Sequence, residues 1–542
     1  MRLPRGVFVC VNTTVSPRHR PKILIVGNRT FLTNSACPTE MGPGDSRCFT
    51  FLQEVLSENE GEQRTPSSRI KTDDGVSGSH VLRGRYVSVE VGDAVCDATT
   101  FGAVGDGRTD DTAAIQKALD HCGSQPNGGQ VVLPAPRTYL VVSLLLKFSH
   151  TQLHIPRGAT LLGSDNFSLW NASGSQASAI IVAARQGHVR LEHIAITGGG
   201  TVDGQGLAFW LGESKACKPH AHCEFFRPHT VDFNGVTYGL LTDTLYTNSP
   251  NHVLELGCDH CELSHVSVLN IPVDVTLANG SCPLTKEETH DKDGCWQTAS
   301  NTDSVDVHGS PFYIHDVNFT SGDDNVAVHA NNTLVEDSFF GSGHGASIGS
   351  CGEGTYLTNI TFRNITFESL PRGSGQNGCR IKTDGSVQHA RIWNVTYQGL
   401  TMKEVGYTIM VTQDYNSKAS SGFLMENVVF RDIVSTHAGH KFIIGASNQS
   451  DVPMVAPSRP AQTPVVMLDC STELAHHANC HGFVLDNIKH ASPISGASMS
   501  CTGVFGTSSA VLGIGPSCLH SEPQHNSLGA VARQPINGRD RV

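Results

Sequence analysis

The stretch FYIHDVNFTSGDD at Phe312–Asp324 alternates apolar and polar side chains and then ends in a polar turn. The pattern returns as TLVEDSFFGSGHG at Thr333–Gly345 and as YLTNITFRNITFE at Tyr356–Glu368. Upstream, residues 188–204 and 252–270 have the same character, and the units recur every 20 to 32 residues. Alternation over a few residues, bounded by Gly, Asn and Asp, predicts short half-buried strands.

Short strands at such a period predict an all-β solenoid, a parallel β-helix in which each coil stacks on the last. A helical pattern does not return between the strands, which disfavours a βαβ sheet. A β-sandwich or a propeller is the alternative that the pattern leaves open. One short N-terminal helix is expected at residues 110–122, where Thr109, Asp110 and Asp111 precede apolar residues at helical spacing. We expect this helix to cap the open apolar end of the coil.

The two ends of the chain differ from this body. Residues 1–85 are expected to be an atypical leader followed by a disordered linker, because residues 57–80 contain almost no apolar side chain. The β-helical domain is expected at residues 86–518, and a disordered tail at residues 519–542. A signal peptide is not evident, since the apolar run at residues 7–11 is shorter than the usual core of roughly 7–15 residues.

Composition excludes several classes of protein. The 542 residues include 55 Gly and only 16% charged side chains, which argues against a helical bundle. The net charge of −12 and the lack of a basic stripe argue against a nucleic-acid partner. No apolar run approaches the roughly 18 residues of a membrane span. We expect a monomer without a membrane partner.

Cysteine is abundant, with 14 of the 17 residues lying between positions 96 and 518. This density predicts disulfide bonds and a secreted, extracellular protein. Frequent Asn-X-Ser/Thr sequons fit a glycoprotein. Candidate pairs at short separation are Cys217/Cys223, Cys258/Cys261, Cys282/Cys295, Cys470/Cys480 and Cys501/Cys518. A zinc site of Cys217, His220, His222 and Cys223 is the less favoured alternative to the first pair.

Four polar clusters lie on successive strand units and predict a site. They are Asn301-Thr302-Asp303, Gly322-Asp323-Asp324, Gly343-His344-Gly345 and Arg380-Ile381-Lys382. Asp303 and Asp323 are 20 residues apart, and His344 follows after 21 more, so equivalent positions should stack on one face. Three carboxyls brought together repel one another, and at least one pKa should rise. A protonated carboxyl beside an ionised one is the requirement for glycosidic cleavage.

These four clusters in this order resemble the signature of the polygalacturonases, glycoside hydrolase family 28. Further stretches agree: FGAVGDGRTDDTAAIQKAL from residue 101, GTVDGQG from 200, RPHTVDF from 227, TNSPNHVLEL from 247 and QDY from 413. The resemblance covers residues 96–518 and implies a right-handed parallel β-helix. It also implies inverting hydrolysis of the α-1,4 bonds of polygalacturonate, without a cofactor or metal.

The resemblance implies a role for each residue of the site. Asp323 would be the general acid, while Asp303 and Asp324 would activate the attacking water. His344 would hydrogen-bond near the acid and help to hold its proton. The substrate-binding residues would be Asn301, Arg380, Lys382 and Tyr415. The two cations among them would bind the substrate carboxylate, and Tyr415 would shape the neighbouring sugar subsite.

The sequence departs from the family pattern at three places. Asn325 and Phe340 stand where the family often has a pair of cysteines. Ser304 replaces a small residue, so its hydroxyl should lie beside Asp303. We expect Cys351 and Cys379 to form a replacement disulfide, because they lie about one repeat apart and neighbouring strands are about 4.8 Å apart.

The third departure is an insertion between Val268 and Asn301. It contains Cys282 and Cys295 and several acidic residues, and it leads directly into Asp303. We expect it to form a wall at one end of the groove, which favours exo action. The alternatives left open are a pectin or pectate lyase, a rhamnogalacturonan hydrolase, and a non-catalytic β-helical glycan binder.

Overall fold

The computed structural model places the backbone of residues 24–26 and 29–31. It then describes residues 79–521 except 173–177, 185–186, 188, 217–225, 278–279, 283–295, 298, 370–376, 388, 416–421, 437–463, 471–478, 492–497 and 515–516. The expected zinc ligands and both members of the Cys217/Cys223 pair fall outside the described residues. None of the helices within the described ranges is long and apolar enough to cross a bilayer.

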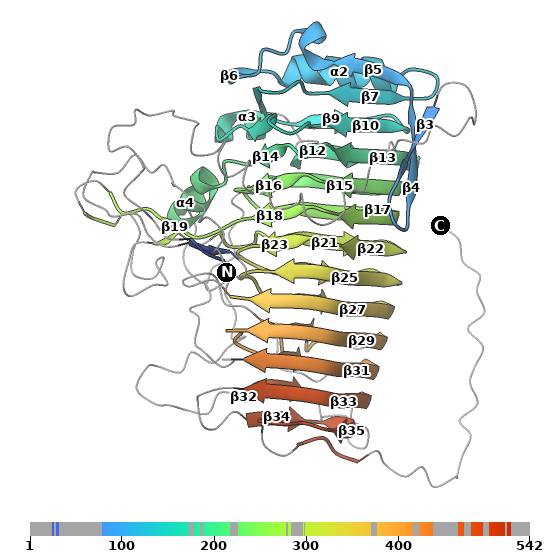
Figure 1. The fold of residues 1–542 in the computed structure, drawn as a ribbon, viewed down its shortest axis with the longest axis vertical. Coiled ribbons are helices and arrows are strands. Elements are labelled where there is room, and N and C mark those ends of the chain that lie inside the picture. The colour runs from blue at the N-terminus through green and yellow to red at the C-terminus, as the bar shows by residue number, and fades with distance from the viewer. Residues whose placement is uncertain are drawn as a thin grey trace, which may run out of the picture.

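The described body is a right-handed parallel β-helix, as the sequence predicts (Figure 1). Its coils contribute strands to one continuous 29-stranded sheet within the described residues. The strands of its N-terminal half are β5 (Ala94–Asp97), β6 (Asp106–Asp110), β7 (Gly129–Val132), β8 (Thr138–Val141), β9 (Leu144–Leu146), β10 (Thr151–His154), β11 (Thr160–Gly163), β12 (Ala179–Ala184), β13 (Leu191–Thr197), β14 (Thr201–Asp203), β15 (His229–Thr242), β16 (Leu245–Thr247), β17 (Leu254–Ser264) and β18 (Ser267–Leu269).

The C-terminal half of the sheet continues in the same way below β18 in Figure 1. Its strands are β21 (Val305–His308), β22 (Phe312–His315), β23 (Asn318–Thr320), β24 (Val326–Val328), β25 (Thr333–Phe340), β26 (Ala346–Cys351), β27 (Tyr356–Glu368), β28 (Cys379–Thr383), β29 (Ala390–Lys403), β30 (Ile409–Thr412), β31 (Phe423–Thr436), β32 (Pro464–Asp469), β33 (Cys480–Ala491), β34 (Ser498–Thr502) and β35 (Val504–Ser509).

Parallel register stacks inward side chains into continuous columns, which form the core. Phe319 pairs with Phe340 in the next coil, and their ring centroids lie 5.9 Å apart. The ring of Phe340 then meets Phe367 edge-on at 5.3 Å. In another column Tyr397 stacks between Phe362 at 4.7 Å and Phe430 at 5.2 Å. All of these rings are buried, so each coil contributes aromatic area to an uninterrupted apolar interior.

The expected capping helix is α2 (Thr112–Gly123), which lies over the first coils. Ile115, Ala118 and Leu119 form its buried face. A disulfide joins Cys122 of this helix to Cys96 on β5. The capping contact differs from the expected one in detail: Asp110 accepts the Thr112 N–H at 2.9 Å, whereas Asp111 accepts the amides of the preceding loop.

Two helices that the sequence did not predict lie on one flank of the coil, α3 (Phe167–Ala172) and α4 (Leu207–Ala216) (Figure 1). The insertion begins and ends there as a short antiparallel pair, β19 (Val273–Asp274) with β20 (Trp296–Gln297). β20 contacts α4. The stem of the insertion is therefore ordered, while most of its interior lies outside the described residues.

A hairpin of β3 (Ser79–Arg83) and β4 (Ser88–Gly92) runs along the side of the coils (Figure 1). Val87, Val89 and Val91 are buried against the body. The turn is held by the fully buried Glu262, which accepts the amides of Arg85, Tyr86 and Val87 at 2.7 Å each. β1 (Leu24–Val26) and β2 (Arg29–Phe31) form a two-stranded antiparallel sheet that is not part of the 29-stranded sheet.

The cysteine predictions are partly confirmed. Cys258–Cys261, Cys470–Cys480 and Cys501–Cys518 are disulfides, as expected. Cys282 is also disulfide-bonded, and its expected partner, residue 295, lies outside the described residues.

The expected Cys351–Cys379 bond is wrong, because both thiols are free and buried. The strand register explains the error. Cys379 lies beside Ala346, whereas Cys351 lies beside Thr383 at the other end of the strand. A spacing near one repeat therefore does not bring the two side chains together.

Candidate active site

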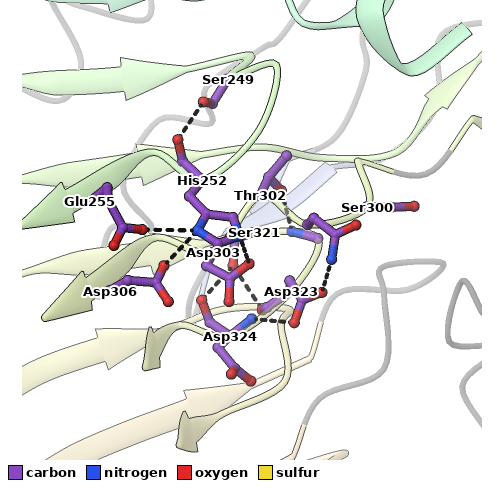
Figure 2. A network of polar contacts seen from close by, with 12 residues as sticks. Ser249, His252, Glu255, Ser300, Thr302, Asp303, Asp306, Ser321, Asp323 and Asp324 are labelled. Carbon is purple, nitrogen blue, oxygen red and sulfur yellow. Dashed lines mark hydrogen bonds and ion pairs between the residues drawn. The ribbon is translucent and has the colours of Figure 1, made fainter. Parts of the chain in front are cut away.

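The residues of the predicted site come together at one end of a row of short strands. Pairing of β17 with β21, of β21 with β24 and of β24 with β26 puts His252, Asp303, Asp324 and His344 at equivalent positions of four successive coils. Asp323 immediately precedes this row, and Arg380 and Lys382 lie on β28, the next strand. The polar turns that follow each strand unit in the sequence thus form one contiguous cluster. Figure 2 shows the part of it that contains His252, Asp303, Asp323 and Asp324.

Asp323 is paired with His344. Nδ1 of the imidazole lies 2.7 Å from Oδ1 of the carboxyl, and both side chains are at most 10% exposed. Burial opposes ionisation of Asp323, but the charge and hydrogen bond of His344 outweigh it and lower its pKa. Within the described part of the chain, Nε2 of His344 is buried without a hydrogen-bond partner. The 2.7 Å separation is that of a hydrogen bond, in which one proton lies between Nδ1 and Oδ1.

Asp324 lies at the base of the cluster with no exposed surface. Nζ of Lys382 is 2.8 Å from one of its oxygens, and Nη1 of Arg380 is 3.0 Å from the other. The Ser347 hydroxyl donates to the same oxygen as Arg380, at 2.7 Å. Burial raises the pKa of Asp324, but the two cations more than compensate, so the pKa lies below its ordinary value. The two cations therefore favour the ionised form of this carboxyl.

Among the three predicted carboxyls, Asp303 is the one whose pKa rises, and burial together with the charge of Asp303 also raises the pKa of the neighbouring Asp306. Burial and the neighbouring charge of Asp323 raise the pKa of Asp303 to about 7. The sequence predicted that one pKa among the three carboxyls would rise, and the structure places the rise here rather than on Asp323. At acidic pH the resting cluster therefore keeps a proton on Asp303. Because these carboxyls interact strongly, the proton belongs to the cluster as a whole.

Tyr415 and Asn301 lie at the edges of the cluster. The ring of Tyr415 lies under Lys382 and Arg380, with its centroid 4.9 Å from Nζ and 5.6 Å from Cζ. Asn301 donates to the second oxygen of Asp323 at 3.4 Å. All eight predicted site residues are thus found in one cluster: Asn301, Asp303, Asp323, Asp324, His344, Arg380, Lys382 and Tyr415.

Sequence reasoning missed several groups that contact this cluster. Arg227 is buried and donates to Asn301 Oδ1 at 3.1 Å and to the Ser300 carbonyl at 2.8 Å. It also pairs with Glu213 of α4 at 3.3 Å. In the sequence, its stretch RPHTVDF shows only a likeness to the family. The contacts of Arg227 are not evident there, because they join residues more than 70 positions apart.

The second missed group is a cluster of His252, Glu255 and Asp306 beside Asp303 (Figure 2). Asp306 follows Asp303 by only three residues in the sequence, but Asp303 precedes strand β21 (Val305–His308), so alternation along the strand could not have placed the two carboxyls on one face. His252 carried no such signal, since a single histidine at the start of a strand is more often a packing residue.

Two sets of donors in the cluster are close enough to hold a metal ion, namely His252 with Asp303 and Asp306, and Asp323 with Asp324 and His344. In the second set Asp324 is already neutralised by two cations. A metal ion there would be repelled by Arg380 and Lys382. In the first set the imidazole itself already balances the carboxylates.

The missing cysteine pair is replaced by hydrogen bonds and aromatic packing. Asn325 donates to the carbonyls of Phe319 and Ser342 at 3.1 and 3.2 Å and accepts the Gly345 amide at 3.0 Å. Phe340 fills the position of the other cysteine within its aromatic column. The turns carrying Asp324 and His344 are therefore tied together without a covalent bond.

Comparison with known proteins agrees with this geometry. The family model described as "Glycosyl hydrolases family 28" matches residues 129–455. The chain belongs to family 28. A second model, "Rhamnogalacturonase A/epimerase, pectate lyase-like", matches residues 95–154, where the family 28 coil begins. The family predicted from the four clusters is therefore confirmed.

Relatives of this family 28 chain include a probable polygalacturonase of Arabidopsis thaliana, 29% identical over 63% of this chain and 67% of the relative. An endo-polygalacturonase of Pectobacterium carotovorum is 29% identical over 60% of this chain and 78% of the relative. The chain spans 62% of the length of a polygalacturonase of Juniperus ashei and 48% of that of a probable endopolygalacturonase D of Aspergillus flavus.

Solved structures agree on the fold. A polygalacturonase from Erwinia carotovora superposes with a TM-score of 0.53 at 22% identity, over 78% of this chain and 99% of that one. An endo-xylogalacturonan hydrolase from Aspergillus tubingensis gives 0.56 at 20% identity, over 78% of this chain and 100% of that one. At these identities the superpositions support the parallel β-helix and carry no argument about substrate.

Proposed function

We propose that the protein hydrolyses α-1,4-galacturonosidic bonds of pectin or polygalacturonate with inversion at the anomeric carbon. The observation that carries the proposal is the division of three carboxyls into three states. Asp324 is ionised against two cations, Asp323 shares a proton with His344, and Asp303 has a pKa raised to about 7. Acid and base roles require this kind of separation in ionisation among neighbouring carboxyls.

The reaction uses the proton that the cluster holds below about pH 7. In the productive form it lies on Asp323, and Asp303 and Asp324 are carboxylates. Asp323 donates this proton to the glycosidic oxygen as the bond to the anomeric carbon breaks. A water on the opposite face of the sugar attacks that carbon and gives its proton to Asp303. Inversion needs about 6.5–9.5 Å between acid and base to admit the water.

Arg380, Lys382 and Tyr415 support galacturonate as the substrate. Two buried cations beside an aromatic face form a site for a sugar carboxylate. A lyase that removes a proton next to the carboxylate would leave the Asp323–His344 pair without a role. A non-catalytic glycan binder would have no need of the costly burial of three carboxyls.

The assignment of Asp323 as the acid is tested with two substrates. Asp323→Asn should lower kcat on polygalacturonate by about 10²–10⁴-fold. An aryl galacturonoside with a good leaving group should lose much less, because its departure needs no proton. Asp303→Asn is the matched variant and should lose activity equally on both substrates. If Asp303→Asn is instead relieved by the good leaving group, Asp303 is the acid. If Asp323→Asn keeps more than about a tenth of kcat, the acid assignment fails.

We further propose exo action, because the insertion is anchored close to the site. Its stem pairs Val273 with Gln297 and Asp274 with Trp296, and it rejoins the chain shortly before Asn301. Replacing residues 278–295 with a short Gly-Ser linker keeps this stem. Products of polygalacturonate should then change from monomer or dimer to mixed oligomers. Early release of long oligomers by the intact protein would contradict a wall at the end of the groove.

The disulfides support a secreted, extracellular location for the protein, because such bonds persist in oxidising environments. A monomer is our proposed state, and light scattering under native conditions tests it.

A further inference from the structure

We propose that His252 is a positioning residue that favours the carboxylate form of Asp303, so that the proton of the carboxyl cluster can move from Asp303 to Asp323. The proposal rests on the proposed hydrolysis and adds to it a residue that none of the four sequence clusters contains. It also explains how a resting cluster with its proton on Asp303 can reach the productive arrangement.

The fold places His252 directly against Asp303. Leu254 pairs with Val305 in the neighbouring coil, and the Val253 amide donates to the Asp303 carbonyl at 2.8 Å. His252 and Asp303 are therefore neighbours at the same register position. Figure 2 shows Asp303 with His252 on one side and Asp323 and Asp324 on the other. His252 thus occupies the place next to the catalytic row on the side away from Arg380 and Lys382.

The imidazole of His252 contacts three carboxyls through both of its nitrogens. Nδ1 lies 3.1 Å from Glu255 and 3.3 Å from Asp306, and Nε2 lies 3.6 Å from Asp303. A neutral imidazole has one donor and one acceptor nitrogen, so one of these contacts would face a lone pair. When the facing carboxyls are ionised, only the imidazolium can donate to both sides.

Every titratable group packed around His252 favours this charged form or is neutral. From β15, the ring of His229 lies 5.1 Å away, and burial with the charge of His252 lowers the pKa of His229 to about 4. From β17, which begins just after His252, Glu255 faces the imidazole of His252 and also contacts His308 at 2.9 Å. From β21 and the turn before it come Asp303 and Asp306. Burial alone would lower the pKa of His252. The charges of Asp306 and Asp303 outweigh burial and raise this pKa to about 10.

A fixed positive charge beside Asp303 opposes the two effects that keep it protonated, burial and the charge of Asp323. The resting and productive forms of the cluster differ only in where one proton lies, so they have equal net charge. A cation next to Asp303 and remote from Asp323 lowers the free energy of the productive form selectively. Loss of that cation leaves the proton on Asp303, where it blocks activation of the water.

The test uses His252→Gln, which keeps a polar side chain and removes the charge. Two results are expected together on polygalacturonate. kcat should fall at least tenfold while KM changes less than about threefold, and the alkaline limb of the pH–rate profile should move to higher pH. His252→Lys should recover part of kcat. The matched control is His260→Asn, an exposed histidine further along β17 that packs on Tyr238, and its profile should match the wild type.

A second readout does not depend on hydrolysis. In protein with ring-labelled histidine, the NMR signal that disappears in His252→Gln should remain that of an imidazolium at pH 8. Titration of this signal near pH 6.5, or an unchanged alkaline limb in a folded His252→Gln, would overturn the proposal. If the signal remains that of an imidazolium but the wild type releases no reducing ends from polygalacturonate, the proposed hydrolysis is wrong. The charged state of His252 beside Asp303 is then still confirmed.

Discussion

Lys382→Met tests whether Asp324 is a buried ion whose charge is balanced mainly by two cations. The side chain of Lys382 is 8% exposed and that of Asp324 is fully buried, with 2.8 Å between Nζ and Oδ2. Methionine has a similar length and no charge, so the change removes the charge without opening a large cavity. Removing one partner of a buried pair costs about 3–5 kcal/mol. Because Arg380 and Ser347 still contact Asp324, we expect about 3 kcal/mol at pH 7.

The same reasoning predicts how the loss depends on pH. In the wild type the pKa of Asp324 is depressed, so its stabilising contribution is present above the unfolded value and is lost only as the pH falls through the folded value. In Lys382→Met the pKa of Asp324 rises, because its nearest cation is gone. Protonation then relieves part of the penalty in acid. The difference in unfolding free energy between the two proteins should therefore be smaller at pH 4 than at pH 7.

Urea unfolding followed by intrinsic fluorescence at both pH values measures this difference. The matched control is Lys403→Met, which breaks the pair of Lys403 with Glu368, where the lysine side chain is 45% exposed. An exposed pair of this kind contributes at most about 1 kcal/mol. The reasoning is refuted if both variants lose the same stability at pH 7. It is also refuted if the loss in Lys382→Met does not shrink at pH 4.

Three further predictions concern the core, the thiols and the pH optimum. Phe340→Ala should cost about 3–5 kcal/mol in urea unfolding, whereas Tyr356→Ala, at an exposed position, should cost less than about 0.5 kcal/mol. Alkylation of the unfolded, unreduced protein should label both Cys351 and Cys379 in peptide maps, and a linked peptide would contradict the strand register. Hydrolysis should decline as the pH rises through about 7, where the cluster around Asp303 loses its proton, and a rate maximum above neutrality would count against this.

The sequence predicts this fold well because its determinants are local. Alternation such as that of Phe312–Asp324 fixes which side chains face inward, and equal spacing between units makes successive coils stack. The same logic identifies α2 from its apolar stripe. It fails for α4, whose LAFWLGESKA segment shows no helical periodicity of apolar side chains.

The candidate site is predictable wherever a short motif carries several chemical groups at once. Asp303, Asp323, Asp324 and His344 belong to such motifs. His252 and Arg227 do not, because their importance depends on partners 51 and 74 residues away that only the register identifies. The Cys351–Cys379 prediction failed for the same reason. Spacing along the chain says which coil a residue occupies, but not which end of its strand.

Helix α2 has a consequence for the behaviour of this protein at high concentration. A coil of parallel strands is open at its first turn, where an apolar column and unpaired backbone groups could accept the strands of another molecule. α2 places Ile115, Ala118 and Leu119 over that column, and the Cys96–Cys122 bond fastens it there. We therefore expect the helix to oppose association at this end of the coil as well as to cover the core. We expect reduction of the Cys96–Cys122 bond to make end-to-end association of molecules easier.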